Sequence, residues 1–247
     1  FLSKVTGVPM VRLATEIMLG RRLRELGYGT GLWPVRPLVA VKAPVFSMSK
    51  LGGVDTYLGP EMKSTGEVMG VDTSFVPAMY KAMVAAGLSL PPSGEILISI
   101  ADRDKPDAVP IIRQFAALGY TFCATSGTAE LIRSLGLPVR VARKLRGRRA
   151  EKELSRLDPN HTPTVVDVIR QREGVAVINP MTGAEIPLRD GFEIRRAAVE
   201  LRIPCLTSLD TARALAGALA AGDGSYSVRP LHEYVGPPLA VAGTDVL

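Results

Sequence analysis

The stretch EILISIADRDKPDAVPIIRQFAALGYTFCATSGTAELIRSLGLPVRVA, residues 95–142, alternates short apolar runs with segments of helical character. Its first run, residues 95–101, is apolar at nearly every position, which is typical of a strand buried on both faces of a parallel sheet. A helix is expected over 106–118, because Pro106 suits the first turn of a helix and Gly119 follows its end. This alternation of strand and helix predicts an α/β domain.

The same alternation continues beyond this stretch. Helical crossovers between parallel strands build a doubly wound sheet, and five strands are expected in it. Strands are predicted at 95–101, 120–125, 138–142, 175–179 and 203–208, and helices at 106–118, 128–135, 164–172, 192–202 and 210–221.

A small, hydroxyl-rich turn follows the second predicted strand. Open α/β sheets bind ligands outside the carboxyl ends of their strands. The turn Thr125-Ser126-Gly127-Thr128 opens a helix there, so it offers backbone N–H groups, hydroxyls and the positive end of a helix dipole. Together these groups suit a phosphate. The same residue types are also ordinary helix caps, so this turn alone does not decide between capping and binding.

Three further polar residues follow other predicted strands. Lys105 and Lys144 would bring positive charge to the same edge, and Asn179 could hydrogen-bond a base or a ribose. Taken singly, each lysine is explained as a solvated side chain and the asparagine as a turn former. The hypothesis of a phosphate site rests on their common position at the strand ends of one sheet.

The chain before residue 87 has a different pattern. The segment 87–94, GLSLPPSG, is typical of a linker. Before it we expect a helix at 8–26, a strand at 38–48, a glycine-rich loop over 52–74 and a helix beginning near Phe75. These elements are too few for a core of their own, which indicates the edge of a larger domain.

The net charge is +6, and much of the excess lies in one short stretch. Aromatic residues do not alternate with these basic residues, which argues against a surface for nucleic acid. We interpret the cluster as a solvated loop or an anion site. Its members are Arg140, Arg143, Lys144, Arg146, Arg148, Arg149 and Lys152.

Three observations bear on the compartment. Cys123 and Cys205 lie in apolar runs without the spacing of a metal site, which suits a reducing cytoplasm. No apolar run reaches the roughly 18 residues that span a bilayer. The opening residues also lack the apolar region of a signal peptide. A cytoplasmic protein without a membrane partner is therefore expected.

Three segments carry a resemblance to a known family. FLSKVTGVPM at 1–10, LGPEMKSTGEVMGVD at 58–72 and the region 191–214 resemble, in this order along the chain, segments of the large subunit of carbamoyl-phosphate synthetase. The resemblance implies three parts. Residues 1–90 would be an α+β tail of the second ATP-grasp unit, 91–235 a methylglyoxal-synthase-like allosteric domain, and 236–247 a C-terminal extension.

The resemblance also implies an activity. The family makes carbamoyl phosphate from bicarbonate and ammonia with ATP and Mg²⁺, for pyrimidine and arginine synthesis. A small amidotransferase subunit releases the ammonia from glutamine. The metal ligands of the family would lie upstream of Phe1, so we expect no turnover of ATP by this chain alone and assign it no catalytic residue or metal ligand. A homo-oligomer is left open.

Effector binding is implied at the strand-end site. The expected effectors are UMP or IMP, with ornithine in some members. Thr207 matches a position that contacts ornithine, but Ala43 stands where a carboxylate would be needed. At Thr182 the sequence Asn-Pro-Met-Thr-Gly departs from the commoner family pattern. The expected effector residues are Lys105, Thr125, Ser126, Thr128, Lys144, Asn179 and Thr182.

The sequence leaves two other functions open. The chain could be a freestanding sensor of nucleotides or phosphate without catalysis. It could also be a methylglyoxal synthase, but that enzyme uses an aspartate in a Gly-Gly-Asp segment, and residues 144–149 read Lys-Leu-Arg-Gly-Arg-Arg. The connection 146–163 is longer and more basic than is usual for the family, and its role stays open.

Overall fold

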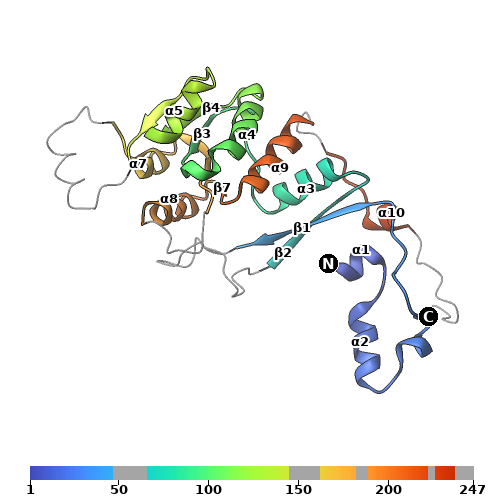
Figure 1. Cartoon of the computed structure of the whole chain (residues 1–247). Coiled ribbons are helices and arrows are strands. Elements are labelled where there is room, and N and C mark those ends of the chain that lie inside the picture. The colour runs from blue at the N-terminus through green and yellow to red at the C-terminus, as the bar shows by residue number, and fades with distance from the viewer. Residues whose placement is uncertain (47–65, 145–161, 182–188, 222–225, 237–247) are drawn as a thin grey trace.

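The computed structural model describes residues 1–46, 66–144, 162–181, 189–221 and 226–236 (Figure 1). Within them, five parallel strands form one sheet in the order β5-β4-β3-β6-β7. This confirms the predicted doubly wound α/β fold. The strands are β3 (Glu95–Ile98), β4 (Thr121–Thr125), β5 (Arg140–Ala142), β6 (Gly174–Ile178) and β7 (Cys205–Leu206).

Helices cover both faces of this sheet. Ile96 and Ile98 of β3 contribute to one apolar core, and Leu97 between them contributes to the other, as the alternation of a strand requires. Each such buried side chain contributes about 1.5–3 kcal/mol. The first face carries α4 (Lys105–Ala117), α5 (Ser126–Ser134) and α9 (Leu209–Ala220), and the second carries α7 (Val165–Arg170) and α8 (Arg189–Glu200).

A two-stranded antiparallel ribbon precedes the sheet. It pairs β1 (Val39–Val45) with β2 (Gly66–Asp72), and α3 (Phe75–Ala85) packs on it. The prediction of a loop over 52–74 is therefore wrong for β2. The two glycines of this strand, Gly66 and Gly70, gave its sequence the character of a loop. Gly70 is required by the close approach of α3 and not by a turn.

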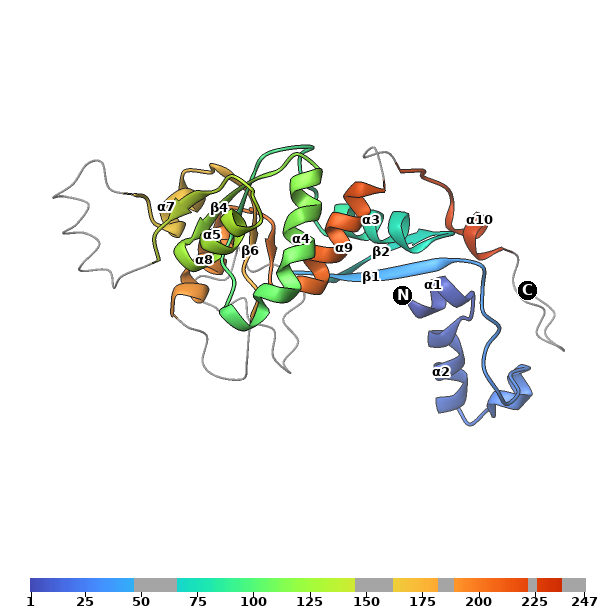
Figure 2. The same cartoon turned by 45° about the horizontal axis from the view of Figure 1, so that its top comes forward.

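The helix predicted over 8–26 is also wrong in its extent. The structure has α1 (Leu2–Thr6), α2 (Met10–Met18) and the 3-10 helix η1 (Leu23–Leu26). Gly20 adopts φ +94°, a left-handed conformation that ends a helix. Figures 1 and 2 show α1 and α2 at the opposite end of the molecule from α7.

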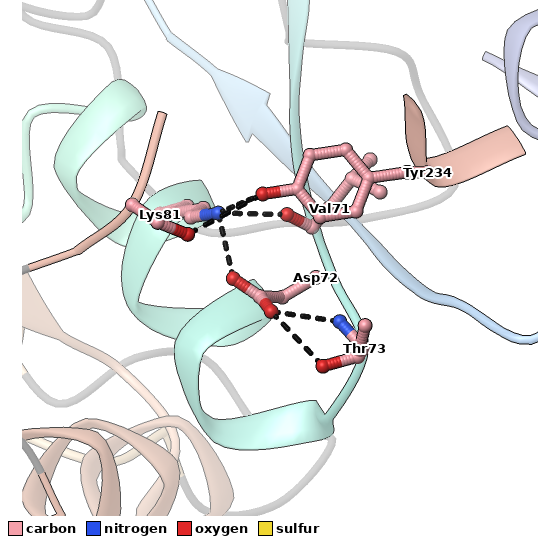
Figure 3. Close-up of polar contacts among 6 residues, drawn as sticks. Val71, Asp72, Thr73, Lys81 and Tyr234 are labelled. Atoms are coloured by element: carbon pink, nitrogen blue, oxygen red, sulfur yellow. Dashed lines mark hydrogen bonds and ion pairs between the residues drawn. The ribbon is translucent and has the colours of Figure 1, made fainter. Parts of the chain in front are cut away.

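Helix α3 connects the ribbon to the α/β sheet. It packs against α9 as well as against the ribbon, and its Met83 is buried in the first core of the sheet (Figure 2). A short helix that the sequence did not indicate, α10 (Leu231–Val235), contacts β2 and, through Tyr234, α3. There Lys81 of α3 donates to the hydroxyl of Tyr234 and to the carbonyl of Val71, each at 3.0 Å (Figure 3).

No helix in the described ranges is both long enough and apolar enough to cross a membrane.

The thiol of Cys123 is expected to resist alkylation in the folded protein. Its side chain on β4 is fully buried, and this burial raises the pKa of the thiol to about 11. At pH 8 only about one part in a thousand would be the reactive thiolate. Mass spectrometry after iodoacetamide treatment should find Cys123 unmodified in buffer and modified in urea. Rapid modification in buffer would contradict the burial.

Candidate functional site

The carboxyl ends of β4, β3 and β6 lie side by side at the point where the order of the strands reverses. The chain passes from β3 to β4 on one side, and later places β6 on the other side of β3. Ligands of doubly wound sheets bind at this switch in strand order. Lys105, Thr125, Ser126, Thr128 and Asn179 all stand at or just beyond these three strands.

The hydroxyl-rich turn is the first turn of α5, which begins two residues earlier than expected. Thr125 is the N-cap, but its hydroxyl lies 3.4 Å from those of Ser99 and Thr128 instead of capping the helix. Thr128 Oγ1 in turn accepts a hydrogen bond from the N–H of Ile100 at 3.1 Å. Both threonines are buried, whereas Ser126 is exposed. The buried hydroxyls thus fix the turn against β3, and its outer edge faces solvent.

Lys105 places a positive charge beside this turn. A Cβ added to Gly127 would lie 3.4 Å from the Lys105 Nζ atom, so the ammonium group lies against the first turn of α5. Lys105 Nζ also pairs with Asp102 Oδ1 at 2.7 Å, although the Asp102 side chain is 92% exposed. An exposed pair of this kind is weak, so an incoming anion could replace the carboxylate.

Lys144 contributes to the same electrostatic environment. The hydrogen bond and the charge of Lys105 lower the pKa of Asp102, and the charge of Lys144 lowers it further. Lys144 follows β5 and is exposed. Lys105 at the start of α4 and Lys144 after β5 therefore both act on one exposed carboxylate, which marks a region of positive potential.

Asn179 lies on the other side of β3 from the hydroxyl-rich turn, at the end of β6. It follows β6 and is 7% exposed. Its Nδ2 donates to the carbonyl of Ser99 at 3.1 Å, and its Oδ1 accepts from Arg195 Nη1 of α8, also at 3.1 Å. The amide therefore links the end of β3 to the helix behind β6.

Two residues of this region were missed by the sequence analysis: Ser99 and Arg195. Ser99 lies within the apolar run 95–101 and looked like part of a strand. Arg195 lies in the predicted helix, where a charged residue usually faces solvent. A signal was nonetheless present, since Ser99 is a polar residue in an otherwise apolar run, two residues before the expected end of that strand.

The remaining expected residues lie elsewhere or cannot be placed. Thr182 is outside the described residues. Thr207 follows β7, and its carbonyl accepts from the N–H of Met181 at 3.1 Å. Ala43 lies in β1 and pairs with Val68 of β2. Within the described ranges, no three His, Cys, Asp or Glu side chains gather as a metal site would require.

Comparison with known proteins gives matches of two kinds, to a family model and to curated sequences. Residues 107–207 match the family model of the MGS-like domain. Over 234 residues, 95% of this chain, the sequence is 53% identical to the carbamoyl phosphate synthase large chain of Thermomicrobium roseum. The chain spans 21% of the length of that relative. This chain is thus similar over nearly its whole length to part of a carbamoyl phosphate synthase large chain, and residues 107–207 match an MGS-like domain.

Proposed function

We propose that this chain is part of the large subunit of a glutamine-dependent carbamoyl-phosphate synthetase and carries its effector-binding regulatory domain. The observation that carries the proposal is the identity of 53% over nearly the whole chain. The whole enzyme would use ATP and Mg²⁺ to make carbamoyl phosphate from bicarbonate and ammonia. A small amidotransferase subunit would supply the ammonia, and the assembly would work in the cytoplasm.

Residues 1–90 would be the tail of an ATP-grasp unit, with 91–235 as the regulatory domain and 236–247 as an extension. Large apolar side chains on the first elements support this division. Val11, Met18 and Leu19 are 79%, 86% and 79% exposed on and beside α2. Exposed apolar surface of this kind is typical of an interface. Another part of the large subunit would cover it, and this chain alone would not turn over ATP.

The effector site would lie at the carboxyl edge of the sheet. Its ligand would be a phosphate monoester such as UMP or IMP, with the phosphate at the first turn of α5 and the lysines beside it. The remaining polar groups would contact the ribose or the base. The proposed residues are Lys105, Thr125, Ser126, Thr128, Lys144 and Asn179, with Thr182 from the stretch that the structure does not describe.

Effector binding would act on the synthetase through the contact between α3 and α9. Such coupling is typically worth about 1–3 kcal/mol. Helix α3 packs on the ribbon and on α9. A shift of α9 would therefore move α3, and with it the surface on which the ribbon packs. The linker 87–94 also packs on the sheet, because Leu88 and Leu90 lie against its first core and the hydroxyl of Tyr120 donates to the carbonyl of Pro91. Helix α3 and this linker would together carry the coupling between the two parts.

Replacing Lys105 with alanine is expected to weaken UMP binding tenfold or more, because one charged hydrogen bond to the phosphate is lost; this corresponds to about 1.4 kcal/mol. Calorimetry with UMP, IMP and inorganic phosphate measures the change. Arg113→Ala is the matched control, since it removes one positive charge from an exposed position on the same helix. Equal losses in both variants would indicate unspecific attraction, and no binding by the unmodified chain would refute the site.

A further inference from the structure

A buried arginine lies behind the carboxyl edge of the sheet. Arg195 of α8 is 3% exposed, and among its contacts Nη1 donates to Asn179 Oδ1 at 3.1 Å. Burying a guanidinium group is costly unless it makes hydrogen bonds. Its hydrogen bond to a strand-end asparagine is therefore a feature that the fold maintains against a large desolvation cost.

This contact fixes the orientation of the Asn179 amide. The carbonyl of Ser99 can only accept and the guanidinium of Arg195 can only donate. The amide must therefore turn its nitrogen toward Ser99 and its oxygen toward Arg195. An amide nitrogen carries two hydrogens, so the one not needed for Ser99 can donate to a ligand in a fixed direction.

The same contact is the end of a longer network. Asn179 bonds the carbonyl of Ser99, and the hydroxyl of Ser99 lies 3.4 Å from that of Thr125. Thr125 in turn lies 3.4 Å from the hydroxyl of Thr128. These contacts thus connect α8, the ends of β6, β3 and β4, and the first turn of α5, which are the parts of the proposed site other than the lysines and Thr182.

A glycine makes room for the arginine. A Cβ on Gly191 would lie 2.8 Å from Arg195 Nη1 and 3.4 Å from Asn179 Oδ1. Gly191 lies in the first turn of α8, where alanine would otherwise be the better helix former by about 1 kcal/mol. The absence of a side chain therefore leaves space for this hydrogen bond.

We propose that Arg195 is a positioning residue for the effector site: it holds the amide of Asn179 in the one orientation that presents a donor to a phosphate monoester ligand. It acts through Asn179 and does not contact the ligand. The inference rests on the proposed effector site for its ligand, but the orientation of the amide can be tested without any ligand.

The ligand-free test measures hydrogen exchange of the Asn179 side-chain amide by NMR, with its signals identified by their loss in Asn179→Ala. Arg195→Met should accelerate this exchange about tenfold or more, and Arg195→Lys should restore part of the protection. Gly191→Ala should also accelerate it, and this variant keeps both partners and a good helix former. The matched control is Arg196→Met, because the buried Arg196 donates to Glu200 of its own helix at 2.7 Å. Unchanged exchange in Arg195→Met and Gly191→Ala would overturn the proposal.

The binding test is a double-mutant cycle with UMP, measured by calorimetry. Arg195→Met and Asn179→Ala should each weaken UMP binding about tenfold, and the double variant should bind no more weakly than either single variant. Losses that multiply to about a hundredfold would show that the two residues act independently, and would overturn the proposal. If the unmodified chain binds neither UMP nor inorganic phosphate, the effector site itself is refuted, whereas the exchange experiment still decides whether Arg195 orients Asn179.

Discussion

Replacing Gly70 with alanine is expected to lower the free energy of unfolding by about 3 kcal/mol, the upper end of the usual cost of overpacking. Gly70 lies in β2 beneath α3, and a Cβ there would lie 2.5 Å from the backbone nitrogen of Ala82 and closer still to the carbonyl oxygen of Ala78. Both are backbone atoms, so no side chain can turn away to make room. The strand and the helix would have to separate, which would open the packing around the buried Ala78 and Ala82.

The matched control is Gly66→Ala in the same strand. A Cβ at Gly66 meets nothing within 4 Å, and its φ is not in the left-handed region. This substitution should leave stability unchanged or raise it by up to about 1 kcal/mol, because it restricts the unfolded chain. Urea unfolding of the two variants measures the difference. A Gly70→Ala variant as stable as Gly66→Ala would contradict the packing of α3 on β2.

The parallel sheet could be predicted because its strands are buried on both faces. Burial on both faces leaves a nearly continuous apolar run such as 95–101, and Gly119 or a proline marks the helix ends between such runs. The strand β2 could not be predicted in the same way. It is only partly buried, and its Gly70 serves a contact with a helix that follows in the chain, so the local sequence resembles a loop.

The site was predicted in part for a similar reason. The positions of Lys105 and Thr125 follow from the rule that ligands bind beyond the carboxyl ends of parallel strands. The bond between Asn179 and Ser99 joins residues 80 positions apart. The contact of Arg195 with Asn179 likewise depends on which helix covers which face. Pattern and spacing do not contain that information, so the supporting residues emerged only from the folded chain.

Replacing Lys81 with methionine is expected to cost about 2–3 kcal/mol of stability. Lys81 Nζ lies 2.6 Å from Asp72 Oδ2, and both side chains are 13% exposed (Figure 3). Breaking a buried ion pair leaves an uncompensated charge, which costs about 3–5 kcal/mol, and the remaining exposure here reduces that figure. The hydrogen bonds to Val71 and to Tyr234 of α10 are lost as well.

Lys42→Met is the matched control. Lys42 Nζ lies 2.6 Å from Glu67 Oε2 on the same ribbon, but the two side chains are 53% and 43% exposed. An exposed pair contributes about 0–1 kcal/mol, so this variant should lose no more than that. The two pairs have the same distance and the same residue type at the cation. Equal losses would mean that burial is not what makes the Lys81 pair important.

The pH dependence separates the ion pair from simple packing. Partial burial works to raise the pKa of Asp72, but hydrogen bonds from Lys81 and Thr73 outweigh it and hold the pKa below its ordinary value. A carboxyl whose pKa is lowered by folding stabilises the fold above its unfolded pKa, and this stability is lost as the pH falls through the folded value. The gap between the unmodified chain and Lys81→Met should therefore be largest near pH 7 and shrink in acid below about pH 4. A gap that stays constant with pH would assign the loss to the aliphatic packing of Lys81 instead, and α10 would then be held to α3 without help from charge.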